Sequence, residues 1–468
     1  MEEGHVKLYV CGITSYDYCH IGHARSALVF DMVVRYLRYR GYKVTFVRNF
    51  TDIDDKIIAR AAEQGVGSQE LAERFIAEFY TDMDALGVLH PDIEPKATEH
   101  INEMIELVQE LIDCGLAYPS GGDVYYRVGK FADYGMLSGR SLDDMQAGAR
   151  IEVSGKKEHP MDFVLWKGAK PGEPKWQSPW GEGRPGWHIE CSAMSRKYLG
   201  ENFDIHGGGK DLIFPHHENE IAQSVGANQK PFANLWMHHG FVTIKDEKMS
   251  KSLGNFLTIR DVLRDYPAEV LRLFLFSTQY RNPLDFTEAA LQDAQAGLDR
   301  MYACLAGIAG LPGAGDGQPV IGTKDRLKIE SLRPRFESAM DNDFNTAQAL
   351  GLLFDAVKVL NKVTRMLPAQ AAGDDLQLVR QGGADLQELA GLLGVVQQDP
   401  QQYVQRKKQQ LLAAIELSAD EIDALIAQRK NARDRKDWAA GDAVRDELLA
   451  HNIELHDGPE GTTWDVKS

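Results

Sequence analysis

Apolar side chains follow two different spacings in the first sixty residues. Two short apolar, β-prone runs, Lys7–Cys11 and Val44–Asn49, predict strands. Between them, Ala27–Tyr39 carries apolar residues at helical spacing, and Gly41 follows as a residue suited to a C-cap. A strand, a helix and a second strand predict a βαβ unit, which is typical of a doubly wound parallel sheet.

The pattern changes twice more before residue 290. Helices are expected over about 68–118. Residues 119–185 are dense in glycine, proline and tryptophan, and they predict a β-rich insertion. Alternating strands and helices return over 186–290. We therefore expect an α/β fold in which a Rossmann-type parallel sheet is interrupted by an insertion.

The remaining third of the chain is predicted to be mostly helical. Leu311–Pro319 is rich in glycine and proline and predicts a linker. Two largely helical stretches follow, 326–367 and 376–396, and a last helix is expected around 419–450. The domains expected from these changes are a sheet domain over 1–290, a linker with a helical bundle over 291–396, and a small C-terminal domain over 397–468.

Composition narrows the class of protein without naming it. The 468 residues are 43% hydrophobic, no apolar run reaches the length of a membrane span, and the polar start has no signal-peptide pattern, so no membrane partner is expected. The net charge of −17 argues against a general nucleic-acid coat protein, although a local basic face could still bind RNA. The five cysteines are few, odd in number and widely spread, which predicts reduced thiols and a cytoplasmic location.

Two short motifs carry the first chemical hypothesis. His20-Ile21-Gly22-His23 follows the first strand, and Lys248-Met249-Ser250-Lys251-Ser252 lies in a charged segment. His20, His23, Lys248 and Lys251 could donate to a triphosphate, whose α-phosphate gains charge in the transition state. For either motif alone, two surface histidines or a solvated lysine loop is the alternative. Together they resemble class I aminoacyl-tRNA synthetases, which implies an acyl-adenylate made from ATP, with Mg²⁺ accompanying ATP.

A metal site is the second hypothesis. His216 and Glu220 are four residues apart at a predicted helix start, so they share one face. Cys11 and Cys191 could complete the site, and their separation excludes a finger-type loop. A surface His/Glu pair is the commoner explanation of the spacing alone, and the spacing does not decide whether the two cysteines meet.

Longer segments make the resemblance specific to the cysteinyl-tRNA synthetase family, from about residue 6 to the C-terminus. The segments that carry it are Tyr9–Thr14, His20–Arg25, Thr51–Lys56, Arg184–Met194, His206–Leu212, Phe214–Glu220 and the lysine motif. The resemblance implies one zinc ion held by Cys11, Cys191, His216 and Glu220, with the thiol of L-cysteine bound directly to the metal. Four protein ligands usually make a closed site, so Glu220 is expected to be the ligand that moves.

The same resemblance implies the remaining substrate contacts. Gly22 and the run Gly207-Gly208-Gly209 would let ATP approach the backbone, with Asp211 accepting the ribose hydroxyls; a tight turn is the alternative for the run. Trp187, His188 and Thr51 would wall the amino-acid pocket, where core packing or a solvated loop is the alternative. Family members carry about fifteen to twenty residues before the first strand, so an edge element is expected to be shortened here.

The C-terminal segment supplies the RNA hypothesis. The run 429–438 is the densest basic stretch and ends on Trp438, and basic plus aromatic residues suit single-stranded RNA. A solvated helix face is the alternative from the residues alone. By resemblance, 397–468 is an anticodon-binding domain in which Arg429, Trp438 and Asp442 contact tRNA(Cys), and the chain is expected to be a monomer.

Two other functions remain open at this point. A cysteine ligase of the mycothiol pathway resembles the same core but attaches cysteine to an amino sugar, and the segment after residue 400 argues against it. A non-catalytic RNA-binding paralogue is the second alternative, and the intact histidine and lysine motifs argue against it.

Overall fold

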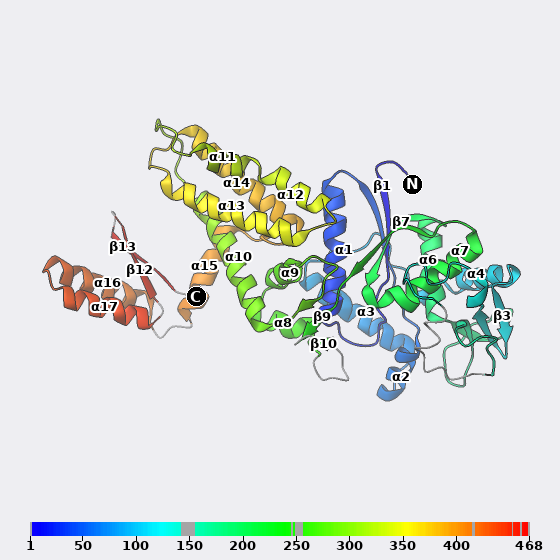
Figure 1. Cartoon of the computed structure of the whole chain (residues 1–468). Coiled ribbons are helices and arrows are strands. Elements are labelled where there is room, and N and C mark those ends of the chain that lie inside the picture. Colours follow the sequence, from blue (N-terminus) through cyan, green and yellow to red (C-terminus); the bar gives the residue numbers. More distant parts are fainter. Residues whose placement is uncertain are drawn as a thin grey trace. The chain divides into compact units, whose positions relative to one another are not determined.

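The computed structural model describes residues 2–141, 155–244, 256–413, 417–451, 453–458 and 461–466, and the backbone of 247–248. The chain forms two compact units (Figure 1). The first consists of Met1–Gln295, Pro334–Leu352 and Leu392–Val395, and the second of Ala296–Arg333, Leu353–Gly391 and Val396–Ser468.

A four-stranded parallel sheet in the order β2-β1-β7-β8 forms the centre of the first unit. Its strands are β1 (His5–Val10), β2 (Lys43–Arg48), β7 (Phe203–Gly209) and β8 (Ala233–His239). Leu8 of β1 stands opposite Phe46 of β2 and Ile205 of β7. The chain leaves β1 for β2 on one side and meets β7 on the other, so the topological switch point lies between β1 and β7. This confirms the Rossmann-type doubly wound sheet.

Helix α1 (Ile21–Tyr39) begins six residues before the expected Ala27. The reason is local: His20 and His23 form a capping box, in which each ring nitrogen Nδ1 accepts the other residue's backbone N–H. This arrangement satisfies two of the N–H groups that a helix start leaves without partners. The histidine motif therefore forms the first turn of α1.

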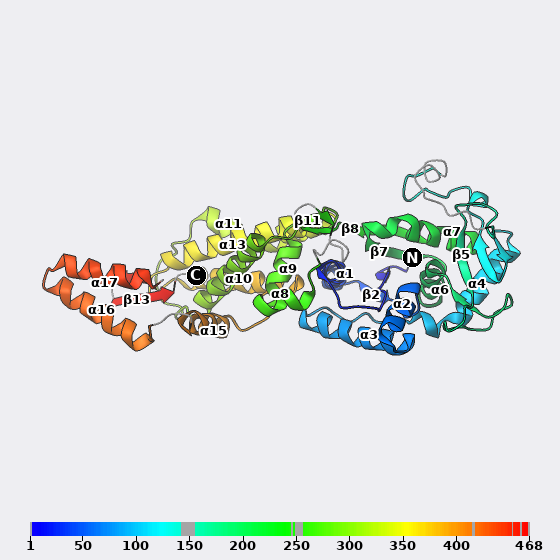
Figure 2. The same ribbon diagram turned by 90° about the horizontal axis from the view of Figure 1, so that it is seen from below.

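The expected insertion is an antiparallel sheet, β3-β4-β5-β6. Its strands are β3 (Ala117–Ser120), β4 (Asp123–Tyr126), β5 (Phe163–Gly168) and β6 (Gly183–Pro185). The helices before it are α2 (Asp55–Gln64), α3 (Ser68–Ala85) and α4 (Ile101–Asp113), so the helical stretch expected up to residue 118 ends earlier. The sheet lies beside α4 and α6 (Trp187–Leu199) (Figure 2). Buried side chains that include Leu107, Trp166 and Ile189 pack together in this region.

The chain after α6 completes the first unit. Helix α7 (Glu218–Asn228) follows the turn Ile213–His217. A three-stranded sheet, β10-β9-β11, contains β9 (Val242–Ile244), β10 (Glu247–Lys248) and β11 (Leu284–Asp285). Helices α8 (Ile259–Asp265) and α9 (Ala268–Phe276) lie between β10 and β11 in the sequence.

The helical part after residue 287 confirms the expected bundle. Its helices are α10 (Glu288–Ala309), α11 (Thr323–Glu330), α12 (Leu332–Asp341), α13 (Thr346–Met366), α14 (Gly373–Leu392) and α15 (Pro400–Ala413). Apolar side chains at helical spacing, such as Met301, Leu353 and Leu386, are fully buried in it. Among the described residues, no helix is long and apolar enough to cross a membrane.

The C-terminal segment differs from the single helix expected around 419–450. Two helices, α16 (Ala419–Asp434) and α17 (Trp438–Ala450), precede the hairpin of β12 (Ile453–Gly458) and β13 (Gly461–Val466). Lys436 adopts a left-handed backbone (φ 61°), and the Asp437 side chain caps α17 by accepting from Ala440 N–H. A residue that caps a new helix ends the helical period before it, which is the physical reason for the break.

Candidate active site

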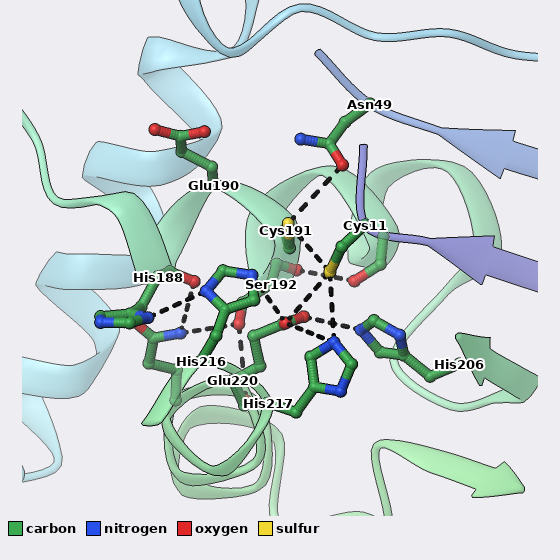
Figure 3. A network of polar contacts seen from close by, with 12 residues as sticks. Cys11, Asn49, His188, Glu190, Cys191, Ser192, His206, His216, His217 and Glu220 are labelled. Atoms are coloured by element: carbon green, nitrogen blue, oxygen red, sulfur yellow. Dashed lines mark hydrogen bonds and ion pairs between the residues drawn. The ribbon is translucent and has the colours of Figure 1, made fainter. Parts of the chain in front are cut away.

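Four side chains expected to bind a metal meet beside the switch point. Cys11 directly follows β1, and Cys191 lies in α6. His216 lies in the turn Ile213–His217 that precedes α7, and Glu220 lies in the first turn of that helix. Their side chains point toward one another (Figure 3). The sheet order, and not the sequence spacing, brings these residues together.

The four residues are close enough to share one ion. Cys11 Sγ lies 3.7 Å from Cys191 Sγ and 3.5 Å from Glu220 Oε1. His216 Nε2 lies 3.1 Å from Glu220 Oε1. One donor atom from each residue falls within 4.8 Å of all the others, and all four residues are buried. Such a spread of donor atoms is compatible with a single divalent cation.

The electrostatics of the group also fit a cation. Burial raises the pKa of both thiols, Cys11 and Cys191, and lowers the pKa of His216 to about 3. Burial also disfavours the charged form of Glu220, but the neighbouring His206 and His216 outweigh it and lower the pKa of this carboxyl. His216 Nε2 is a buried nitrogen with no aligned hydrogen bond. A buried carboxylate beside a bare imidazole nitrogen and two thiols is a donor set that a soft divalent metal satisfies.

Two histidines that the sequence analysis did not select also lie beside the four candidate metal ligands. His206 Nε2 lies 2.8 Å from Glu220 Oε2, and His217 Nε2 lies 3.4 Å from Cys11 Sγ. With Cys11 and Glu220 they form a second group that could hold a metal. His217 directly follows His216 and His206 opens the glycine run, so both stood inside motifs already quoted. Glu220 is thus held on both oxygens, and the movement expected of it would break the contact with His206.

The three residues expected to line the substrate pocket make contacts at two different places. Trp187 stacks on His216 with ring centroids 4.1 Å apart, and His188 Nδ1 lies 2.9 Å from His216 Nδ1. Thr51 instead donates its hydroxyl to Glu190 Oε2 at 2.7 Å. Burial raises the pKa of Glu190, the residue before Cys191, well above its ordinary value.

The capping box also determines which face the two motif histidines present. Each Nδ1 accepts a backbone N–H, so the proton of each neutral ring lies on Nε2. The rings stack with centroids 3.8 Å apart. His20 and His23 therefore each carry an N–H on Nε2 at the N-terminus of α1, where the helix dipole also favours an anion.

The glycine run has a packing role of its own. Gly207, Gly208 and Gly209 end strand β7, so the run is a strand and not the tight turn that was the alternative. A Cβ on Gly207 would lie 2.2 Å from the Phe30 ring, and one on Gly208 would lie 2.9 Å from the His217 ring. Asp211 is exposed in the short 3₁₀ turn Lys210–Leu212, directly beyond the carboxyl end of β7.

The lysine motif is described only at its first residue. The backbone of Lys248 lies in β10, paired with Thr243 of β9. Lys251 and the rest of the motif lie outside the described residues. Beyond it, Leu257 accepts the Ile21 N–H at 3.2 Å, which ties the following segment to the first turn of α1.

The three residues expected to contact an anticodon lie in the C-terminal helices. Trp438 begins α17 with 59% of its surface exposed, and Asp442 is exposed on the same helix. Arg429 of α16 is 8% exposed and bonds Asp457 of the hairpin through both Nη1 (2.8 Å) and Nη2 (2.9 Å). Arg429 therefore holds the hairpin to α16, whereas the two exposed residues, Trp438 and Asp442, lie on α17.

Three protein-family models match successive parts of the chain. They are the tRNA synthetases class I (C) catalytic domain over residues 1–296, the DALR domain over 335–397 and the cysteinyl-tRNA ligase anticodon binding domain over 417–464. The parallel sheet, the histidine motif at the start of α1 and the first of these matches define a class I aminoacyl-tRNA synthetase. Within that class, the chain belongs to the cysteine–tRNA ligase family.

Full-length relatives agree with this family. The cysteine–tRNA ligase of Desulfotalea psychrophila is 64% identical over 467 residues, covering 100% of this chain and 96% of the relative. That of Geobacter sulfurreducens is 56% identical over 469 residues, with the same two coverages. Among solved structures, Mycobacterium tuberculosis methionyl-tRNA synthetase in complex with methionyl-adenylate matches with a TM-score of 0.63 at 17% identity, over 87% of this chain and 93% of that one. The solved structure supports the fold alone.

Proposed function

We propose that this cysteine–tRNA ligase activates L-cysteine with ATP, transfers it to tRNA(Cys), and selects cysteine with a zinc ion held by Cys11, Cys191, His216 and Glu220. The observation that carries the zinc assignment is the convergence of these four buried side chains, with donor atoms within 4.8 Å of one another. The reaction follows from the family to which the chain belongs. The donor set favours zinc among the divalent metals, because thiolate and imidazole are ligands that zinc prefers.

Zinc bound there would supply a Lewis acid that binds the substrate thiolate. The chain's own residues do the rest of the selection. Trp187, stacked on His216, covers the imidazole, and His188 orients that ring from its other nitrogen. A serine hydroxyl is a far poorer partner for this site than a thiol, so rejection of serine follows from an unsatisfied buried group and not from pocket size.

The phosphate chemistry is assigned to the start of α1 and to the lysine motif. His20 and His23 present Nε2–H donors and are proposed to stabilise the charge that grows on the α-phosphate, and Lys248 and Lys251 are proposed to bind the pyrophosphate. Gly22 lies between the histidines, and Asp211 lies beyond β7, where a ribose would be held. Mg²⁺ is proposed to enter with ATP.

RNA recognition is assigned to the C-terminal helices. Trp438 has the exposed aromatic face that a base needs for stacking, and Asp442 lies one helical turn away from it. Arg429 contributes through the hairpin that it holds. The five cysteines are all free thiols, which supports the cytoplasmic location; the monomeric state rests on the family resemblance and is tested by light scattering.

The function is tested by metal analysis together with ATP–pyrophosphate exchange. We expect about one zinc per chain, and exchange with cysteine but not with serine. Cys191→Ser should lose the zinc and the cysteine-dependent exchange. Cys304→Ser is the matched control, because Cys304 is equally buried but lies in α10, outside the metal group. Active protein without zinc would contradict the metal assignment, and charging of an amino sugar in place of tRNA would contradict the substrate.

A further inference from the structure

Helix α1 carries a buried arginine directly after the histidine motif. Arg25 has no exposed surface, and its guanidinium bonds three backbone carbonyls: Nη1 reaches Phe241 O at 2.8 Å, and Nη2 reaches Asn282 O at 2.6 Å and Tyr280 O at 3.3 Å. Its Nε is buried without a partner. Burial lowers the pKa of Arg25 to about 10, so the group remains charged at neutral pH. A buried charge held by carbonyls is costly, so this one calls for an explanation beyond packing.

The three carbonyls belong to one joint in the chain. Phe241 O also accepts the Leu284 N–H at 2.9 Å, and Tyr280 O accepts the Gly240 N–H at 2.8 Å. These bonds start the parallel pairing of β9 with β11, in which Val242 stands opposite Leu284. Arg25 therefore connects helix α1 to the point at which β9 and β11 begin.

Strand β9 is also the partner of the strand that contains Lys248. Thr243 pairs with Lys248 across the β9–β10 ladder, only two residues after the carbonyl that Arg25 binds. The backbone position of Lys248 is thus linked through Thr243 and Phe241 to α1. His23 lies two residues before Arg25 on the same helix.

The segment that follows the lysine motif is fastened to the same helix by its backbone. Ile21 N donates to Leu257 O at 3.2 Å, and Ile259 N donates to Cys19 O at 3.1 Å. Phe256 packs edge-on against the His20 ring, with centroids 5.2 Å apart. On this side main-chain bonds make the link, whereas on the β9 side the Arg25 side chain makes it through three carbonyls.

We propose that Arg25 is a positioning residue for adenylation, which holds the β9–β10 strands, and through them Lys248, in register with His20 and His23. The proposal rests on the proposed roles of the histidine and lysine motifs. Donors that must meet one phosphoryl group tolerate little displacement, and an error of about 1 Å can cost on the order of 10²-fold in rate. A guanidinium can reach three carbonyls in fixed directions, and an ammonium cannot reproduce that geometry.

The first test compares Arg25→Lys and Arg25→Met with a matched control, Arg272→Lys. Arg272 of α9 is likewise buried and bonds the carbonyls of Leu393, Leu86 and Gly87, and it also forms an ion pair with Asp31 of α1. In ATP–pyrophosphate exchange, Arg25→Lys should lower kcat by roughly 10- to 100-fold. Its KM for cysteine and its zinc content should be unchanged. Arg272→Lys should lower the melting temperature while keeping kcat per folded molecule. Normal kcat in both Arg25→Lys and Arg25→Met would overturn the proposal.

The second test is a double-mutant cycle in exchange kinetics with Lys248→Ala. If Arg25 acts through the lysine strand, Arg25→Lys should cost much less in the Lys248→Ala background than in the native chain, because the group it positions is already gone. Multiplicative effects of the two substitutions would overturn positioning of Lys248. Normal exchange in Lys248→Ala and in His23→Ala would instead overturn the proposed function. If the lysine of Arg25→Lys binds the carbonyls well enough to retain activity, Arg25→Met replaces it in both tests.

Discussion

The proposed role of His20 and His23 in adenylation depends on their tautomer. Because each Nδ1 accepts a backbone N–H of the other residue, the proton of each neutral ring lies on Nε2. Burial, followed by the neighbouring His20 and His239, lowers the pKa of His23 well below its ordinary value. His23 is therefore a neutral donor across the physiological pH range.

The tautomer leads to a prediction that separates two similar side chains. His23→Gln places an amide N–H near the position of Nε2, whereas the shorter His23→Asn reaches only the position of Nδ1. We expect His23→Gln to lose less ATP–pyrophosphate exchange activity than His23→Asn, which should fall by roughly 10²–10³ as after removal of a transition-state donor. The ranking is measured in kcat at saturating cysteine. The reverse ranking would show that Nδ1, and not Nε2, faces the phosphate.

The same low pKa predicts a pH profile. A histidine that stays neutral below its ordinary pKa does not change charge as the pH falls from 7.5 to about 6, near the unperturbed value of about 6.5. The native chain and His23→Gln should therefore show parallel exchange rates over that range. A step near pH 6.5 that His23→Gln abolishes would contradict the neutral donor.

The pKa shifts of the four proposed zinc ligands, Cys11, Cys191, His216 and Glu220, predict that zinc binding releases protons. Burial raises the pKa of Cys11 and Cys191, so both thiols hold their protons in the zinc-free protein, while Glu220 is already ionised and His216 is already neutral. Binding zinc should then release about two protons per ion. Because the thiol pKa values are raised, this number should persist at pH values above the ordinary cysteine pKa. Calorimetric titration of chelator-treated protein in buffers of different ionisation enthalpy measures it; a smaller number at high pH would show unperturbed thiols.

Among the elements, α1 has the greatest influence on the site, because its first turn is itself the histidine motif. Gly22 lies between His20 and His23 in the sequence, and a Cβ there would approach His20 Cε1 to 2.7 Å. The His20 ring is held by its stack on His23 and by the capping box, so it would have to leave both. The absence of a side chain at Gly22 therefore keeps the two rings parallel.

This argument predicts a loss of activity with little change in stability. Alanine is favoured over glycine in a helix by up to about 1 kcal/mol, which offsets the lost His20 cap, so Gly22→Ala should change the free energy of unfolding by less than about 1 kcal/mol. Its exchange rate should fall, because His20 is displaced. Gly351→Ala is the control, since Gly351 lies in helix α13 with open space around its Cβ position and should gain stability at full activity. Full activity in Gly22→Ala would remove the steric role of this position.

At the scale of the whole molecule, the residues proposed for adenylation and those proposed for RNA recognition lie in separate parts of the chain. Every proposed adenylation residue precedes residue 252, and the proposed anticodon contacts follow residue 428. Tyr403 of α15 stacks on Tyr302 of α10 with centroids 3.8 Å apart. Helix α15 is thus part of the helical bundle, and a cut at residue 400 would remove one of its core side chains.

A cut after residue 416 should separate the two activities. Deletion of 417–468 removes the whole match to the anticodon binding domain and keeps α15. Cysteine-dependent ATP–pyrophosphate exchange should continue at close to the native rate, because adenylation needs no RNA, while charging of tRNA should fall steeply. Both are measured on the same preparation. Unchanged charging by the shortened chain would exclude a role for this segment in RNA binding.

Within that segment, one aromatic residue is expected to carry much of the affinity. Trp438 is 59% exposed, so Trp438→Ala should change the free energy of unfolding by less than about 0.5 kcal/mol. Its binding to tRNA should weaken by about 1–3 kcal/mol if the ring stacks on a base. Leu449→Ala is the control on the same helix, because Leu449 is 44% exposed. Equal effects of the two substitutions on tRNA affinity would argue against stacking.

Part of this protein could be determined from the sequence by itself. Local apolar spacing predicts the βαβ start and the helical bundle, and local composition predicts the insertion, because each depends on residues a few positions apart. The two phosphate motifs and the family resemblance also lie in contiguous segments, and they named the reaction and four candidate metal ligands. The exception was α16 and α17, where a cap at Asp437 ended a helix that the apolar pattern would have continued.

Other features were decided only by the tertiary structure. Cys11 and Cys191 are 180 residues apart, and they meet because β1 and β7 are neighbours in a sheet whose order no local pattern encodes. His206 and His217 join the metal group for the same reason, although each is unremarkable in its own segment. Arg25 looks like any polar residue of an amphipathic helix, yet folding buries it on three carbonyls from residues more than two hundred positions away. Local spacing reflects interactions between near neighbours in the chain, whereas a binding site is set by which strands and helices pack together.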